Sequence, residues 1–98
     1  MSDVYRQAAK PVGWAKHPHL DAYEFRDHEL RARVAYFPAH GVDYIWSVGK
    51  IEESLPDFTE MYEVMAAGDT IGKVALEQAF NEALLAICDI RLGPGATR

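Results

Sequence analysis

Apolar and polar residues alternate with a period of two through the middle third of this chain. Tyr23 and Phe25, for example, alternate with Glu24 and Arg26. Such alternation is typical of strands that bury one face, and the polar breaks between the strands are short enough for hairpins. The pattern therefore predicts a three-stranded antiparallel meander with one apolar face. The predicted sheet spans residues 21–50, with its breaks at 26–29 and 37–41.

A helical spacing of apolar residues follows over residues 70–90. Leu76, Phe80 and Ile87 belong to one continuous stripe, and Asp69 or Thr70 is the expected N-terminal cap. We expect this helix to pack on the apolar face of the sheet.

The connecting segment 54–68 is compatible with two structures. Ser54 can cap a helix, Pro56 suits its first turn and Gly68 can end it. Its apolar residues also have helical spacing, and these are Phe58, Met61, Tyr62 and Met65. We expect a helix here, and a fourth strand over 60–66 is the alternative.

These elements predict a single α+β domain over residues 1–98. A short helix over 3–10, capped by Ser2 and stopped by Pro11, completes the fold. The three-stranded meander would then carry a short N-terminal helix and two C-terminal helices, with the last helix packed on one sheet face. The expected parts are an arm at 1–20, the sheet at 21–50, the helical part at 54–90 and a flexible tail at 91–98.

Composition narrows the class of partner. The chain has 98 residues and a formal net charge of −5, so it repels phosphate on average. We therefore expect no direct binding to nucleic acid, whereas a basic protein partner suits the charge. Cys88 is the single cysteine, which excludes an internal disulfide. With neither a signal peptide nor a long apolar stretch in the sequence, we expect a cytoplasmic protein without membrane contact.

Three histidines form the first candidate site. The hairpin topology would bring His17, His19 and His40 to one end of the sheet, beside Asp21 and Asp43. Such a rim could bind Zn²⁺ or Ni²⁺, although solvated loop histidines are the simpler interpretation. No suitable nucleophile lies near the histidines. We therefore expect a non-catalytic protein without a cofactor, and a metal-binding or histidine-dependent protein is the alternative.

The second candidate is the polar face of the sheet. Arg26, Arg31 and Arg33 should point there together with Phe37, which could offer a docking surface for a carboxylate or a phosphate. An ordinary solvated face is the favoured interpretation. The long helix or the 54–68 segment could also cover this face.

Acidic and apolar surface residues form the remaining candidates. Val74 and Leu85 lie almost opposite the core stripe of the last helix and predict contact with another chain, including a homodimer. The acidic candidates cluster along one segment and are Glu52, Glu53, Asp57, Glu60 and Glu63.

Together these features favour a non-catalytic protein–protein interaction module. One concrete form is a small acidic inhibitor or accessory factor, of the kind that mobile genetic elements encode. Such a factor would block a nucleic-acid-handling complex by presenting acidic surface to its basic groove. Charge and size alone motivate this hypothesis.

Overall fold

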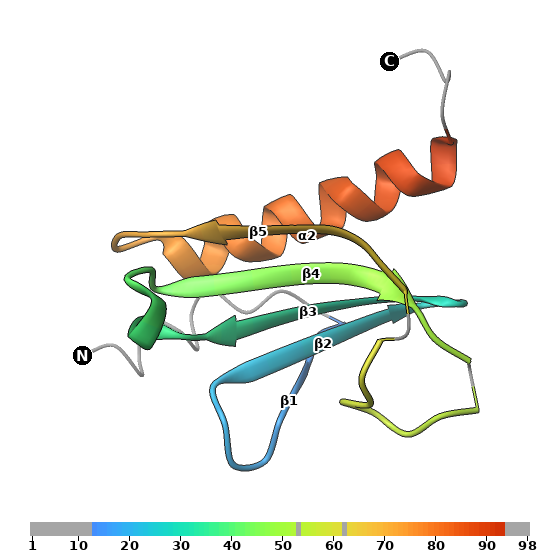
Figure 1. Ribbon diagram of the computed structural model, residues 1–98, viewed down its shortest axis with the longest axis horizontal. Coiled ribbons are helices and arrows are strands. Elements are labelled where there is room, and N and C mark those ends of the chain that lie inside the picture. Colours follow the sequence, from blue (N-terminus) through green and yellow to red (C-terminus); the bar gives the residue numbers. More distant parts are fainter. Residues whose placement is uncertain (1–12, 53, 62, 94–98) are drawn as a thin grey trace.

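Five antiparallel strands form one sheet, and one long helix packs on one of its faces (Figure 1). The computed structural model describes residues 13–52, 54–61 and 63–93. The strands pair in chain order from β1 to β5. In the described part of the chain, no helix is long and apolar enough to cross a membrane. The elements are β1 Ala15–Lys16, β2 Ala22–Asp27, β3 Leu30–Tyr36, the 3-10 helix η1 Pro38–His40, β4 Tyr44–Lys50, β5 Glu63–Thr70 and α2 Ala75–Leu92.

The predicted α+β class and the central meander are confirmed. Val34 in β3 lies opposite both Tyr23 in β2 and Trp46 in β4, so the apolar sets of the three strands share one face. Helix α2 covers this face and contributes Phe80, whose ring centroid lies 4.6 Å from that of Trp14 and 5.3 Å from that of Tyr23. The remaining core is built from Leu30, Ala32, Val34, Tyr44, Val48, Ala75, Leu76, Ala79, Ala83 and Ile87.

The helix predicted over residues 54–68 is wrong. Most of this segment is an irregular connection, and Phe58 has a positive φ of 62°, which no α-helix contains. The alternative strand is present, although it begins at Glu63 and continues to Thr70. The apolar spacing misled because polar contacts with the sheet, described below, occupy the backbone groups that a helix would need.

The predicted last helix is present but begins at Ala75 rather than near Thr70. Thr70 ends β5 instead, and its hydroxyl donates a hydrogen bond of 2.6 Å to the carbonyl of Ala75. The N-cap is Val74, which makes no side-chain capping bond. Strand β1 was not expected, and the helix predicted over 3–10 lies outside the described residues.

Small residues in β4 and β5 allow two close contacts. At Gly68, a Cβ would lie 2.7 Å from Nε1 of Trp46, so the indole lies flat against this strand. The same Nε1 donates a hydrogen bond of 2.8 Å to Glu82 of α2. At Gly49, beside the register shift between β4 and β5, a Cβ would strike the carbonyl oxygen of Glu63. Both glycines therefore hold β5 close to the rest of the sheet.

Candidate functional site

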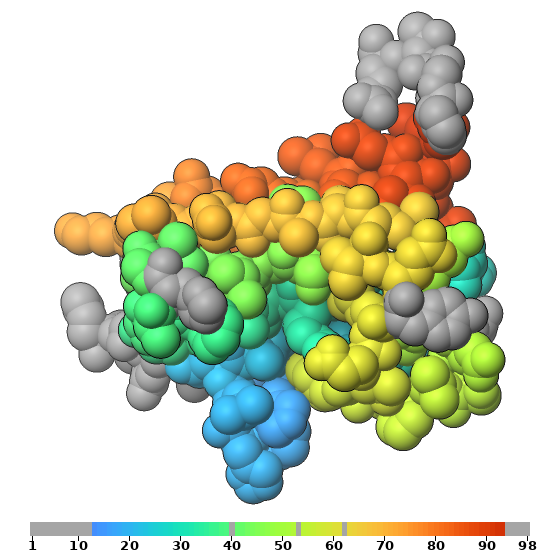
Figure 2. Space-filling model, in the orientation of Figure 1, coloured from blue at the N-terminus to red at the C-terminus, as the bar shows by residue number. Residues whose placement is uncertain are grey.

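The sheet face away from α2 carries charged residues on two neighbouring strands. Glu24 lies directly opposite Arg33, and Arg26 lies directly opposite Arg31. The second pair brings two positive charges together, which destabilises a sheet unless something compensates. The compensation comes from residues 55–59, here called the covering loop, which crosses one end of this face (Figure 2).

The Glu24 carboxylate is the centre of these contacts, with its side chain 3% exposed. It accepts hydrogen bonds from the backbone N–H of Phe58, at 3.1 Å to Oε1 and 2.9 Å to Oε2. Nη1 of Arg31 and Nη2 of Arg33 lie 3.4 Å and 3.3 Å from Oε2. One carboxylate therefore joins two strands to the covering loop.

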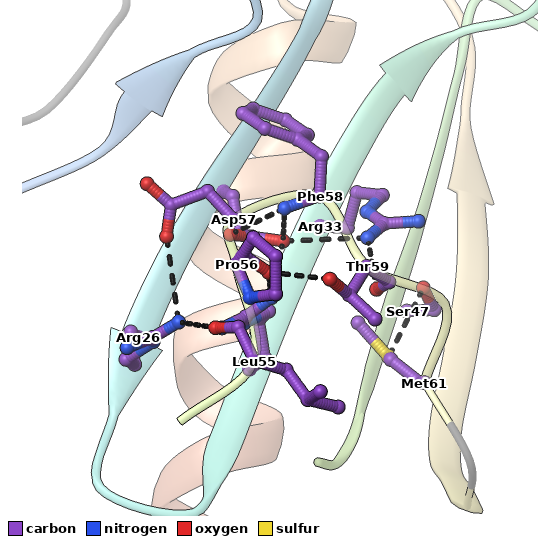
Figure 3. Close-up of polar contacts among 11 residues, drawn as sticks. Arg26, Arg33, Ser47, Leu55, Pro56, Asp57, Phe58, Thr59 and Met61 are labelled. Carbon is purple, nitrogen blue, oxygen red and sulfur yellow. Dashed lines mark hydrogen bonds and ion pairs between the residues drawn. The ribbon is translucent and has the colours of Figure 1, made fainter. Parts of the chain in front are cut away.

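The three arginines bind carbonyl oxygens of the covering loop, and Figure 3 shows Arg26 and Arg33 beside this loop. Arg31 donates to Pro56 at 2.8 Å, and Arg33 donates to Thr59 at 2.6 Å. The carbonyl of Leu55 accepts from Arg26 at 2.9 Å and from Arg31 at 3.4 Å, so it lies between the two opposed guanidinium groups. These oxygens carry the partial negative charge that the arginines need in addition to Glu24.

Phe58 lies at the turning point of the covering loop. Its left-handed backbone, with φ of 62°, aims the N–H at Glu24. The ring stands edge-on to His17, with centroids 4.8 Å apart, and Arg33 lies 5.8 Å from the ring centroid. The loop is thus fixed by its side chain as well as by its backbone.

Burial raises the pKa of Glu24 above its usual value of 4.5, and this effect outweighs the opposing hydrogen bonds from Phe58 and Arg33. Nearby Asp57 acts in the same direction as burial. The chain uses this perturbed carboxyl to hold its own loop. A raised pKa in a buried ion network is therefore a structural feature here.

The predicted docking arginines are engaged by the chain itself. Arg31 is fully buried and Arg33 is largely buried, whereas the Arg26 side chain is 36% exposed and lies 3.4 Å from Asp57. Phe37 is exposed beside η1, at 41%. A partner could reach Arg31 only if the covering loop left the sheet, so the role of these residues in docking stays a prediction.

The predicted acidic residues remain at the surface. Glu52, Glu60 and Glu63 are exposed, and within the described residues none of them forms an ion pair. Asp57 is also exposed and pairs with Arg26. Glu53 lies outside the described residues. Glu52 and Glu60 lie on either side of the covering loop along the chain, and Glu63 is the first residue of β5.

The predicted histidine rim is only partly assembled. Nδ1 of His17 accepts a hydrogen bond of 3.1 Å from the backbone N–H of His19, and the two ring centroids lie 6.2 Å apart. His40 ends η1, but its side chain lies outside the description. In the portion of the chain that is described, no group of at least three His, Cys, Asp or Glu side chains could hold a metal ion. Asp43 instead accepts a hydrogen bond of 2.7 Å from the N–H of Gly72.

Exposed apolar residues gather on α2 and on β5. Val74 and Leu85 are 46% and 64% exposed, as the helical spacing predicted. Val64 and Met65 of β5 are 58% and 41% exposed. Strand β5 forms one margin of the sheet in front of α2 (Figure 2), and this margin was missed because the segment was expected to be helical. The sequence carries little signal for this strand, because Ala66 and Ala67 favour a helix and Gly68 alone disfavours one.

Comparison with known proteins finds no family model, no curated protein and no solved structure that matches this chain.

Proposed function

We propose that this protein is a non-catalytic interaction module that presents an acidic surface to a basic protein. The observation that carries the proposal is the position of Glu52, Glu60 and Glu63. They are exposed around a loop whose backbone is fixed to the sheet, and in the part of the chain that is described they form no ion pair. Charges that remain unneutralised within the chain are available to a partner.

The fixed loop supports this proposal energetically. Binding normally costs free energy when a mobile loop becomes ordered at an interface. Here Arg31 and Arg33 already hold the loop backbone, and Glu24 holds the N–H of Phe58. The net charge of −5 adds a long-range attraction that speeds the encounter with a basic partner.

A nucleic-acid-handling complex is a suitable target class. Its binding groove is lined with basic side chains that normally neutralise phosphates. Carboxylates beside the fixed covering loop could occupy such a groove and exclude the nucleic acid. The protein would then act as a small inhibitor or accessory factor, and added salt would weaken its binding.

Charge reversal tests this proposal. Affinity purification from the native cell with mass spectrometry identifies the partner, and calorimetry with the purified partner measures the dissociation constant. The double variant Glu60→Lys with Glu63→Lys should weaken binding at least about tenfold, and added salt should weaken the wild-type complex.

A matched control separates local from global charge effects. Glu77 and Asp89 are exposed on α2, and reversing both changes the net charge by the same amount. This variant should keep most of the wild-type affinity. Equal binding by both double variants would remove the acidic surface from the proposal.

The histidine alternative requires a separate measurement. Elemental analysis of protein purified without an affinity tag would detect a stoichiometric metal. Unchanged behaviour of the His17→Ala/His19→Ala variant, together with the absence of metal, would end this alternative.

A further inference from the structure

We propose that β5 accepts an extended segment of the partner as an additional strand, and that this segment carries basic residues on both sides of an apolar centre. The inference rests on the proposed function, because it names the class of segment that an acidic interaction module would bind. Strand addition supplies affinity through the backbone and specificity through alternate side chains.

Strand β5 is eight residues long and ends the sheet, so no strand of the described residues pairs with its outer side. Tyr36 donates its backbone N–H to the carbonyl of Asp21, directly before β2, so Tyr44, which lies opposite Tyr36, directs its own backbone groups toward β5. Tyr44 pairs with Thr70, and hydrogen-bonding direction alternates along a strand. Ala67 and Asp69 therefore turn their N–H and C=O groups away from the sheet, and among the described residues no strand pairs with them.

The two edge strands of the sheet differ in how well they are protected against pairing with another strand. At the other margin, β1 is only two residues long, and very short strands are one way in which proteins discourage edge pairing. Strand β5 is long and contains no proline, lysine or arginine between Glu63 and Thr70. The register shift near Val48 and Gly49 disturbs its first residues alone. The stretch from Ala66 to Thr70 remains a regular template.

The side chains of β5 define the chemistry of the segment. Val64 and Met65 are 58% and 41% exposed, so they favour apolar residues in the added strand. Glu63 and Asp69 are exposed near the two ends of β5 and favour basic residues opposite them. Ala67, also exposed, is small and lets an incoming backbone approach closely.

A second copy of this chain is less suited than a basic segment to pair with β5. A two-fold axis would pair two β5 strands in antiparallel fashion, and each strand carries carboxylates at Glu63 and Asp69 but no lysine or arginine. The second strand would therefore bring further carboxylates and no basic side chain to neutralise those of the first, which is unfavourable. Two chains of net charge −5 also repel each other. Charge complementarity thus selects a basic segment.

A synthetic peptide tests the proposal on the full chain. The probe has alternating valine and threonine residues between terminal lysines, and two relatives carry N-methyl groups on one or the other alternate set of backbone amides. Methylation of the set that faces β5 should raise the dissociation constant at least about tenfold, and methylation of the other set should leave it nearly unchanged. A peptide with aspartates in place of the lysines should not bind.

Amide hydrogen exchange provides a site-specific readout. The peptide should slow exchange at Ala67 and Asp69, whose N–H groups face outward, with little effect at Gly68, which already faces β4. The variant Ala67→Pro removes one outward N–H and should weaken the peptide, provided that its circular dichroism matches the wild type.

The outcomes separate this inference from the proposed function. Binding that depends on salt but ignores both methylation patterns overturns strand addition, and so does no binding at all. Neither result affects the charge-reversal test with the natural partner. A dimer in sedimentation that dissociates on Ala67→Pro also overturns the inference, because a second copy would then occupy β5.

Discussion

The Arg31 guanidinium contacts the Glu24 carboxylate in the interior, with Nη1 3.4 Å from Oε2 and the two side chains 0% and 3% exposed. Both groups also bind the covering loop, through the carbonyl of Pro56 and the N–H of Phe58. The pair therefore links β2, β3 and the connection that leads to β5. Removal of either side chain leaves the other side chain, and the loop carbonyl or N–H that it bound, buried without one of their hydrogen-bond partners.

Replacement of Arg31 with Met should lower the free energy of unfolding by about 3–5 kcal/mol. Glu24 would lose one of its two buried cations, and the carbonyl of Pro56 would lose its donor. Urea unfolding followed by Trp fluorescence measures the change. Arg26→Met is the matched control, because this side chain is 36% exposed, and it should cost at most about 1 kcal/mol. Equal costs would show that burial does not decide the strength of these contacts.

The stability contributed by Glu24 should fall as the pH rises. Burial raises the pKa of Glu24 above 4.5 in the folded protein, so the unfolded chain releases this proton first. Each rise in pH through this range therefore favours unfolding. The free energy of unfolding of the wild type minus that of Glu24→Gln should be largest below about pH 4.5 and should decrease until the pH passes the folded pKa. Urea titrations from about pH 4 to about pH 7 measure this difference, and an increase with pH would contradict the dominance of burial.

Truncation of Phe80 should cost about 3–5 kcal/mol. The ring is 1% exposed and contacts Trp14 and Tyr23, so alanine would leave a cavity between α2 and the sheet. Thermal and urea unfolding of Phe80→Ala measure the loss. A cost below about 1 kcal/mol would mean that α2 does not pack on the sheet as described.

Gly49→Ala should destabilise the protein more than Gly68→Ala. The new methyl group would strike the backbone carbonyl of Glu63 in the first variant and the Trp46 indole in the second. A side chain can rotate away more easily than a paired backbone can shift. Gly68→Ala should also alter the fluorescence of Trp46, because the indole would lose its position beside Glu82. If Gly68→Ala were the less stable of the two variants, the contact with the Trp46 indole would be the more rigid one.

The meander and the last helix could be predicted because local patterns specify them. Alternation fixes which residues of β2, β3 and β4 face α2, and the same pattern places Glu24, Arg31 and Arg33 together on the opposite face. The stripe through Leu76, Phe80 and Ile87 specifies α2 in the same way.

The covering loop between β4 and β5 could not be predicted because its structure depends on contacts distant in sequence. Leu55, Pro56 and Thr59 offer carbonyl groups to arginines more than twenty residues earlier in the chain. No periodicity within the segment records these bonds. The helical spacing of Phe58 and Met65 is real, but the pairing of β5 with β4 outweighed it. Because the pairing of β5 with β4 was not predicted, the edge of the sheet that β5 forms could not be predicted either.

The arginines bind three carbonyl groups of the covering loop, and the side chains of Asp57 and Phe58 add further contacts, whereas a carbonyl is offered by every residue alike. Attachment of the loop therefore places little demand on the identity of its outward side chains. Exposed residues next to the loop, such as Glu60, can be exchanged without loosening the contacts that hold the loop on the sheet. In evolution or in engineering, the recognition specificity of this surface could change while the scaffold stays the same.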